Sequence, residues 1–186
     1  QEYITARELP LPLVSATMDG CMECGRDVMD GGAQYNSTGF PGIAIGNLAD
    51  CLALTKYLVY DEKICTGQEL YDAIMANWEG YEQLHQFILH RAPRYGNGNA
   101  YNDWFLKWAS ETFAQLVNAG EGPRGPFYAG LFPVAFHVFY GLTTAATPDG
   151  RKLGEPLADG IPPMQQMDTN GPTVLLSSIL GNLNQY

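Results

Sequence analysis

The chain has 186 residues, of which 46% are hydrophobic and 16% charged, enough for one domain with a hydrophobic core. Twenty acidic residues against ten basic ones give a net charge of -10 with no basic stripe, which argues against nucleic acid as a partner. No apolar run approaches the roughly 18 to 20 residues that span a bilayer, and no leader-like stretch opens the sequence. We therefore expect a soluble, cytoplasmic protein without membrane contact.

The two ends of the sequence suggest a larger protein. The chain begins at Gln1 without an initiator Met and stops at Tyr186 without a helix cap or a polar tail. It also carries 21 glycines and 12 prolines at low charge, more turns than a small solvated domain needs. Residues 1–186 are therefore expected to form a single segment of a large enzyme.

The first half of the chain shows mainly helical spacing. Apolar residues recur at helical intervals over residues 13–23, 48–59 and 81–90. Asp50 and Lys56 stand near the start and the end of the second of these helices, as the helix dipole prefers. Residues 30–42 are instead rich in glycine and typical of an elaborate loop.

Capping residues predict three further helices. Thr66 and Glu69 match a capping box, and the helix that they begin is expected to continue through Trp78. The next helix, from Asn102 or Asp103, is expected to end at Gly120. The last helix is expected to begin at a proline, in the sequence NGPT at residues 170–173.

The second half of the chain contains the predicted strand. Residues 131–140 form a bulky apolar run with little alternation, which is typical of a strand buried on both faces in a parallel sheet or barrel. Residues 147–151 follow with the turn sequence TPDGR, in which Pro fixes φ and Gly supplies a positive φ.

The four cysteines are Cys21, Cys24, Cys51 and Cys65, and without a secretory signal we expect reduced thiols. Cys21 and Cys24 have the spacing of half a zinc site or of a redox pair. A structural zinc site needs four ligands, but Cys51 and Cys65 do not form a second close pair, and the three histidines of the chain are scattered. We therefore expect no bound metal.

No self-contained catalytic motif is present, since the sequence lacks GxSxG, a P-loop, HExxH and a GxGxxG that follows a strand. A series of short blocks is more informative. The blocks are DGCME at 19–23, GGAQYN at 31–36, ADCLALTK at 49–56, NWEG at 77–80, PRYGN at 93–97, ATPDGR at 146–151, LADG at 157–160 and DTNGPT at 168–173. In this order they resemble the glycyl radical enzymes, which are pyruvate formate-lyase-like proteins. The LADG block resembles the diol, choline and hydroxyproline lyase branch.

The resemblance implies the fold class α/β. The chain would be a helix-rich segment, with buried strands, of the ten-stranded α/β barrel of this family. The family's radical glycine lies in an Arg-Val-Ser-Gly-Tyr-like loop, and this sequence contains no such string. The resemblance therefore implies a segment that lacks the radical-glycine domain.

The resemblance also implies a function for the parent enzyme, the longer protein of which this chain would be a segment. In the family, a glycyl radical converts a cysteine to a thiyl radical that takes a hydrogen atom from the substrate. The parent would be a lyase or dehydratase of anaerobic metabolism that cleaves a C–O, C–N or C–C bond of a diol, choline or hydroxyproline-like compound. Formate acetyltransferase-type acyl transfer by the parent, and a non-catalytic fragment or interaction module, remain the alternatives.

The cofactor and partners follow from the same resemblance. A radical activase that uses S-adenosylmethionine would install the glycyl radical, and no cofactor is expected on this chain, which alone should be inactive. The implied partners are the remainder of the parent, the activase and further copies of the parent in a homo-oligomer. A bacterial microcompartment is an alternative location within the cytoplasm.

Two residues offer a literal match to the family's catalytic block. Cys21 and Glu23 stand in the sequence Gly-Cys-Met-Glu, close to the Gly-Cys-Val-Glu-like block of the family. Residues 26–33, which follow, resemble instead the helix that leads into the family's Gly-Gly-Ala loop. We therefore expect no catalytic residue in this chain and a buried helix cysteine at Cys21, with Cys21 and Glu23 as the catalytic alternative.

The predicted strand supplies the candidate substrate contacts. Alternate residues of a barrel strand point inward, so Phe136 and Tyr140 are predicted to line the cavity, with ordinary core aromatics as the alternative. His137 falls on the opposite face, where a satisfied core histidine is expected. Asp149 and Arg151 could act as an acid and an anion clamp, but a turn with a solvated Arg is the favoured interpretation.

Overall fold

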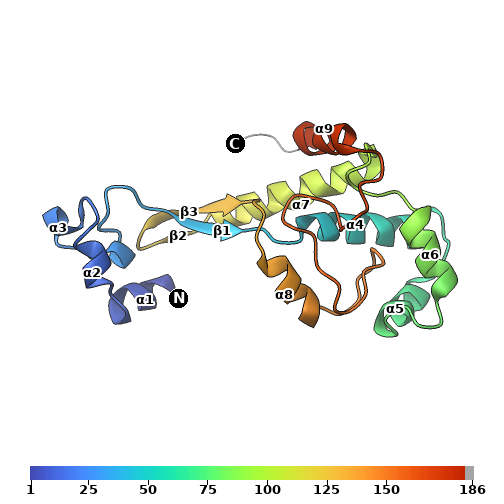
Figure 1. Ribbon diagram of the computed structural model, residues 1–186, viewed down its shortest axis with the longest axis horizontal. Coiled ribbons are helices and arrows are strands. Elements are labelled where there is room, and N and C mark those ends of the chain that lie inside the picture. Colours follow the sequence, from blue (N-terminus) through green and yellow to red (C-terminus); the bar gives the residue numbers. More distant parts are fainter. Residues whose placement is uncertain (183–186) are drawn as a thin grey trace. The chain divides into compact units, whose positions relative to one another are not determined.

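The computed structural model describes residues 1–182, and its chain forms two compact units. Unit 1 contains Gln1–Pro41 and Thr112–Gly130. Unit 2 contains Gly42–Glu111 and the chain from Leu131 onward. Figure 1 labels the elements of both units, and each unit is described by itself below.

Short elements make up unit 1. They are α1 (Glu2–Glu8), α2 (Pro12–Ser15), α3 (Cys21–Cys24), the 3-10 turn η1 (Val28–Asp30), β1 (Thr38–Pro41), β2 (Glu121–Gly122) and β3 (Gly125–Gly130). β1 pairs with β3 in parallel and β2 pairs with β3 antiparallel, so the strand order is β1-β3-β2. The rings of Phe40 and Phe127 meet across the parallel pair, with centroids 4.8 Å apart. The predicted loop over residues 30–42 thus contains a strand.

The single helix predicted over residues 13–23 is wrong, because the structure has two short helices there. Gly20 has φ of 96°, which no residue within an α-helix adopts, and it separates α3 from the chain before it. The Ser15 hydroxyl, at the end of α2, donates to the Asp27 carboxylate at 2.7 Å and accepts the Val28 amide at 2.9 Å. These contacts tie α2 to η1.

Unit 2 is mostly helical. Its elements are α4 (Ile45–Thr55), the π-helix η2 (Lys56–Asp61), α5 (Gly67–Met75), α6 (Glu82–His90), the first part of α7 (Ala100–Asn118), α8 (Phe136–Thr143) and α9 (Pro172–Asn182). The capping box at α5 is confirmed: the Thr66 hydroxyl accepts the Glu69 amide at 3.1 Å, and the Glu69 carboxylate accepts the Thr66 amide at 2.7 Å. The helices predicted from residue 81 and from Pro172 are also confirmed.

The core of unit 2 is built from α4, η2, α5 and α6. Its buried members are Leu54, Leu58, Leu70, Ala73, Trp78, Ile88 and Ala146. Trp78 is 1% exposed although α5 ends at Met75, and its ring stacks on His85 with centroids 5.1 Å apart. Burial of a large aromatic ring contributes much of the apolar area that stabilises such a core.

The π-helix η2 extends α4 by six residues, and its widened turn is seen in the bond from the Glu62 amide to the Tyr57 carbonyl, at 2.9 Å. Residues five apart share a face of a π-helix. Lys56 and Asp61 accordingly form an ion pair at 2.6 Å, and the Tyr101 hydroxyl donates to the same carboxylate at 2.6 Å. Lys56 therefore pairs with a side chain instead of simply facing the end of a helix.

The start of α7 differs from the prediction. The helix begins at Ala100, and Asn99 caps it by accepting the Tyr101 amide at 3.0 Å. Asn102 and Asp103 are both buried inside the helix.

The predicted strand over residues 131–140 is also wrong. Phe136–Thr143 form the helix α8, and its aromatic side chains are largely exposed in the part of the chain that the structure describes. In Figure 1, α8 is drawn in orange and is followed by the long loop that leads to α9, in red. An apolar run without alternation is compatible with either a strand or a helix. Here the loop after α8 contacts the chain at both ends of this helix and stabilises the helix.

None of the helices among residues 1–182 is long and apolar enough to cross a lipid bilayer.

Candidate functional site

The structure places Cys21 and Glu23 on the short helix α3 in unit 1. Cys21 is 3% exposed, and burial raises the pKa of its thiol. The Glu23 carboxylate accepts the Gly20 amide at 2.9 Å and so completes the start of the helix. A buried cysteine on a helix behaves as a small hydrophobic residue. The expected buried helix cysteine is found, and the expected absence of a catalytic role remains a prediction.

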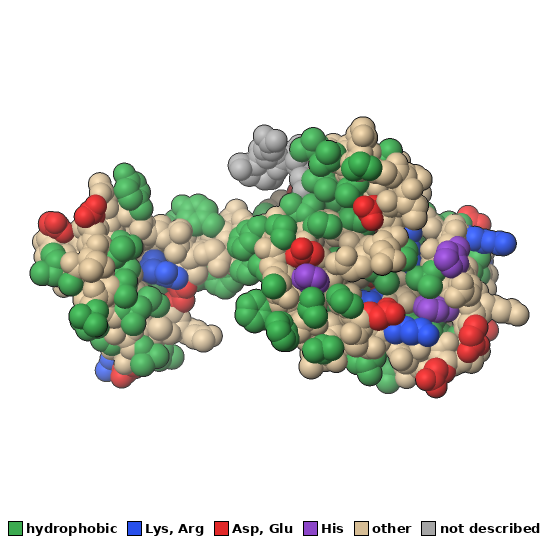
Figure 2. Space-filling model, in the orientation of Figure 1, with side chains coloured by type: hydrophobic (Ala, Val, Ile, Leu, Met, Phe, Trp, Pro, Cys, Tyr) green, Lys and Arg blue, Asp and Glu red, His purple; other side chains and the backbone are tan. Residues whose placement is uncertain are grey.

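Phe136 and Tyr140 lie on α8 in unit 2. They are 61% and 51% exposed, and their ring centroids are 6.2 Å apart because residues four apart share one face of a helix. Phe139 extends the same face, 63% exposed and 6.0 Å from Phe136. Figure 2 shows hydrophobic side chains gathered over α8. We call Phe136, Phe139 and Tyr140 the aromatic face of α8.

The aromatic face differs from the predicted geometry in one respect. In a strand, Val138 would share a face with Phe136 and Tyr140, but in α8 it lies on another side of the helix. Both rings are more than half exposed within the described residues, and the alternative of core aromatics in the parent also stays untested. The lining role itself remains a prediction.

His137 and Gly141 occupy the opposite, inner face of α8. The His137 Nδ1 atom lies 2.7 Å from the Val134 carbonyl and 3.5 Å from the Asp159 carboxylate. Gly141 is buried, and a Cβ atom at this position would lie 2.3 Å from the Glu155 carbonyl oxygen. The satisfied histidine expected from the sequence is therefore found, although on a helix.

Arg151 is not solvated, and this part of the prediction is wrong. Its side chain is completely buried. The guanidinium donates to the backbone carbonyl oxygens of Gly141, Thr144, Ala145, Lys152 and Glu155. A guanidinium has five N–H donors in a fixed fork, so burial without a carboxylate is compensated by these carbonyls. The predicted turn itself is confirmed, with Gly150 at φ of 88° and its amide bonded to the Thr147 carbonyl at 3.0 Å.

Asp149 and Asp50 belong to a buried polar cluster that the sequence reading missed. Asp149 accepts hydrogen bonds from the side chains of Asn47 and Thr147, and its backbone carbonyl accepts one from Arg94. The Arg94 guanidinium also lies 3.8 Å from the Asp50 carboxylate, and both side chains are at least 94% buried. This cluster joins α4 to the loop after α8.

Burial raises the pKa of Asp50 from 3.8 to about 6, and the nearby Arg94 charge partly opposes this shift. Asp50 also accepts the Tyr95 amide at 2.8 Å and the Asn102 side-chain amide at 2.7 Å. Asp50 therefore accepts hydrogen bonds in the interior of unit 2. The prediction that it stands near the start of a helix and interacts with the helix dipole is wrong. One signal in the sequence could have indicated the burial of Asp50. It is an acidic residue among the apolar positions of α4, between Ala49 and Ala53, which are both fully buried.

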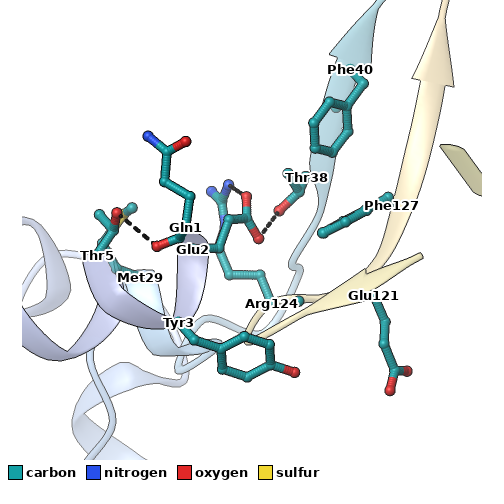
Figure 3. Close-up of a pocket in the computed structure, with 12 residues that line it drawn as sticks. Gln1, Glu2, Tyr3, Thr5, Met29, Thr38, Phe40, Glu121, Arg124 and Phe127 are labelled. Carbon is teal, nitrogen blue, oxygen red and sulfur yellow. Dashed lines mark hydrogen bonds and ion pairs between the residues drawn. The ribbon is translucent and has the colours of Figure 1, made fainter.

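Unit 1 contains a cavity of about 590 Å³ beside its sheet. Figure 3 shows that its walls come from α1, β1 and the hairpin of β2 and β3. Glu2 lies at its centre, 3.3 Å from the Arg124 guanidinium and 3.2 Å from the Thr38 hydroxyl. Phe40 and Phe127 supply the aromatic wall. The charges of Glu2 and Arg124 are paired with each other, and none of the predicted site residues lines the cavity.

Metal-binding groups are not assembled within residues 1–182, where no cluster of three or more His, Cys, Asp or Glu side chains could hold an ion. All four cysteines fall in the described part of the chain and are free thiols. Burial raises the pKa of the Cys51 and Cys65 thiols.

The fold and the sequence together define the family. The sequence matches the pyruvate formate lyase-like family over residues 1–141, and the chain belongs to this family. A crystal structure of a glycyl radical enzyme from Archaeoglobus fulgidus superposes with a TM-score of 0.84 at 35% identity and covers 95% of this chain. The resemblance inferred from the sequence blocks is confirmed.

Two curated relatives are dehydratases. Trans-4-hydroxy-L-proline dehydratase of Clostridioides difficile is 35% identical over 181 residues, which are 95% of this chain and 23% of the relative. (2S)-3-sulfopropanediol dehydratase of Klebsiella oxytoca is 38% identical over 180 residues, which are 93% of this chain and 22% of the relative. The chain likewise covers 23% of the Archaeoglobus fulgidus structure. It thus spans less than a quarter of the length of these proteins.

Proposed function

We propose that this chain is a structural segment of a glycyl radical dehydratase that removes water from a small polyol or hydroxylated amino acid. The observation that carries the proposal is identity of 35% and 38% to two dehydratases over more than nine-tenths of the chain. Both relatives are named for dehydration, so cleavage of a C–O bond is preferred over C–N or C–C cleavage. The dehydration converts the hydroxylated substrate into a product and one water molecule.

The radical chemistry belongs to parts of the parent outside this chain. A radical activase that uses S-adenosylmethionine installs the glycyl radical, and the catalytic thiol comes from another segment. The geometry of α3 supports this assignment, because Cys21 is buried and Glu23 is engaged by the Gly20 amide. Residues 1–186 act as one segment of the barrel, without the radical-glycine domain.

The aromatic face of α8 is the proposed substrate contact of this segment. Phe136 and Tyr140 present large apolar rings, and Tyr140 adds a hydroxyl that can bind a polar group of the substrate. Apolar walls with few polar groups are typical of pockets for small molecules. These two residues would act on substrate affinity and selectivity, while other segments perform the radical steps.

The test is an anaerobic assay of the full-length parent with its activase and S-adenosylmethionine. The substrate panel contains trans-4-hydroxy-L-proline, 1,2-propanediol, glycerol and sulfopropanediol, and pyruvate with coenzyme A tests acyl transfer. We expect an organic radical doublet in the electron paramagnetic resonance spectrum and dehydration of at least one substrate. A radical enzyme that dehydrates none of them, or that forms formate from pyruvate, contradicts the proposal.

Three variants of the parent and one control test the roles of the residues. Cys21→Ser should keep dehydratase activity, since Cys21 takes no part in the radical relay. Phe136→Ala and Tyr140→Ala should change KM or the preference among substrates, whereas Leu142→Ala, on the same helix but off the aromatic face, should not. Loss of all turnover in Cys21→Ser would restore its catalytic interpretation.

A further inference from the structure

The loop over residues 149–160 lies against the inner face of α8. The Leu157 amide donates to the His137 carbonyl at 3.2 Å. A Cβ atom added to Gly141 would lie 2.3 Å from the Glu155 carbonyl oxygen, and one added to Gly160 would lie 2.9 Å from the Phe132 carbonyl oxygen. The backbones of the loop and of the α8 region are therefore in close contact at both ends of the helix.

Opposite charges of the loop stand at the two ends of α8. At the first end, the Asp159 carboxylate accepts the Val134 amide at 2.8 Å. At the last end, the Arg151 guanidinium donates to carbonyl oxygens that include those of Gly141 and Thr144. A negative group near the start of a helix and a positive group near its end both interact favourably with the helix dipole and so stabilise the helix.

The loop is in turn fixed to the interior of unit 2. Asn47 on α4 donates to the Asp149 carboxylate and accepts the Ala158 amide, so one side chain holds both ends of the loop. His85 on α6 lies with its Nε2 atom 2.7 Å from the Gly150 carbonyl oxygen. The orientation of α8 thus follows from contacts that begin in the core.

From these contacts we infer that Arg151 and Asp159 are positioning residues, which hold α8 so that its aromatic face meets the substrate and sets selectivity. The inference rests on the proposed function, because it takes Phe136 and Tyr140 as substrate contacts. Arg151 and Asp159 touch α8 on its inner face and at its ends, so they act on the substrate through the aromatic face. The rings of the aromatic face do not themselves hold α8 in place, because they are more than half exposed within unit 2.

The first test measures amide hydrogen exchange over residues 136–145 in the full-length parent without activation. Arg151→Lys keeps the charge but loses the fork, and Gly141→Ala pushes the loop away from α8. Both variants should speed exchange of these amides about tenfold, as loss of hydrogen bonds to a charged group predicts. Gly181→Ala is the matched control, because a Cβ atom there meets nothing within 4 Å. Unchanged exchange in both variants overturns the inference, whether or not the parent turns over.

The second test separates positioning from general stability by a double-mutant cycle on substrate selectivity. The readout is the ratio of kcat/KM for the two best substrates. Arg151→Lys should change this ratio about fivefold in the wild-type background and less than about twofold in the Phe136→Ala/Tyr140→Ala background, because residues that act through one another are not additive. An equal change in both backgrounds, or no change in either, overturns the inference. If Arg151→Lys does not fold, Gly141→Ala takes its place in the cycle.

Failure of the proposed function is recognised separately. A wild-type parent that carries the radical but dehydrates no substrate of the panel contradicts the dehydratase assignment. The exchange measurement does not depend on turnover, so it still decides whether Arg151 holds α8.

Discussion

Replacement of Asp50 by Asn should change how the stability of the protein depends on pH. The Asp50 side chain is fully buried, and its pKa rises from 3.8 to about 6 on folding, mainly through burial. Between these two values the folded protein holds a proton that the unfolded chain has released. The contribution of Asp50 to stability is therefore fully present below a pH of about 4 and is lost as the pH rises through about 6.

The magnitude follows from the size of the shift. A shift of about two pKa units, at about 1.36 kcal/mol per unit, corresponds to about 3 kcal/mol. Asn has nearly the same shape as Asp and does not titrate. The free energy of unfolding of Asp50→Asn minus that of the wild type should thus increase by about 3 kcal/mol between pH 4 and pH 7, in addition to any pH-independent effect of the substitution.

Urea unfolding at several pH values, followed by tryptophan fluorescence and extrapolated linearly to water, measures this difference. Asp27→Asn is the control of opposite sign. The Ser15 hydroxyl bond lowers the pKa of Asp27, so its contribution is present above the unfolded pKa and is lost as the pH falls through the folded pKa. A difference for Asp50→Asn that stays constant or decreases from pH 4 to pH 7 would refute the reasoning.

Three further predictions concern caps, core and thiols. Thr66→Ala should lower the free energy of unfolding by about 1 kcal/mol because it removes the cap of α5, whereas Thr66→Ser should keep the wild-type value. An unchanged melting temperature in Thr66→Ala would count against the cap. Leu54→Ala, at a fully buried site, should lower the free energy of unfolding by about 2 to 5 kcal/mol, as measured by urea unfolding. Leu48→Ala, at a site 44% exposed, should lower this free energy far less, and equal losses would contradict the assigned core. Iodoacetamide should label the exposed Cys24 well before the buried Cys21, as read by mass spectrometry, and rapid labelling of Cys21 would disprove its burial.

Local signals in the sequence predicted the helices whose ends are defined nearby. The Thr66 and Glu69 pair that begins α5 lies within one turn, so spacing alone reveals it. α8 could not be predicted in this way. Its end contacts come from Arg151 and Asp159, which follow it in the chain, and its own apolar residues fit a strand equally well.

The polar interior was the hardest part to predict. Arg151 stands in a turn sequence that usually faces solvent, and its contacts with carbonyls before and after it in the chain explain its burial. Asp50 and Asp149 meet Arg94 and Asn47 from separate regions of the chain, and no pattern of spacing predicts such meetings. Phe136 and Tyr140 lie on a helix instead of the predicted strand, and their role as substrate contacts stays a prediction.

The π-helix η2 also has a consequence for how this region can change in evolution. A π-turn accommodates one residue more than an α-turn, so deletion of a single codon within Lys56–Asp61 could restore a regular helix. When the deleted residue lies between Lys56 and Asp61, the ion pair is kept, because the two residues are then four apart and residues four apart share a face of an α-helix. Relatives with and without this extra residue should therefore differ in length at η2 and yet both carry the Lys–Asp pair.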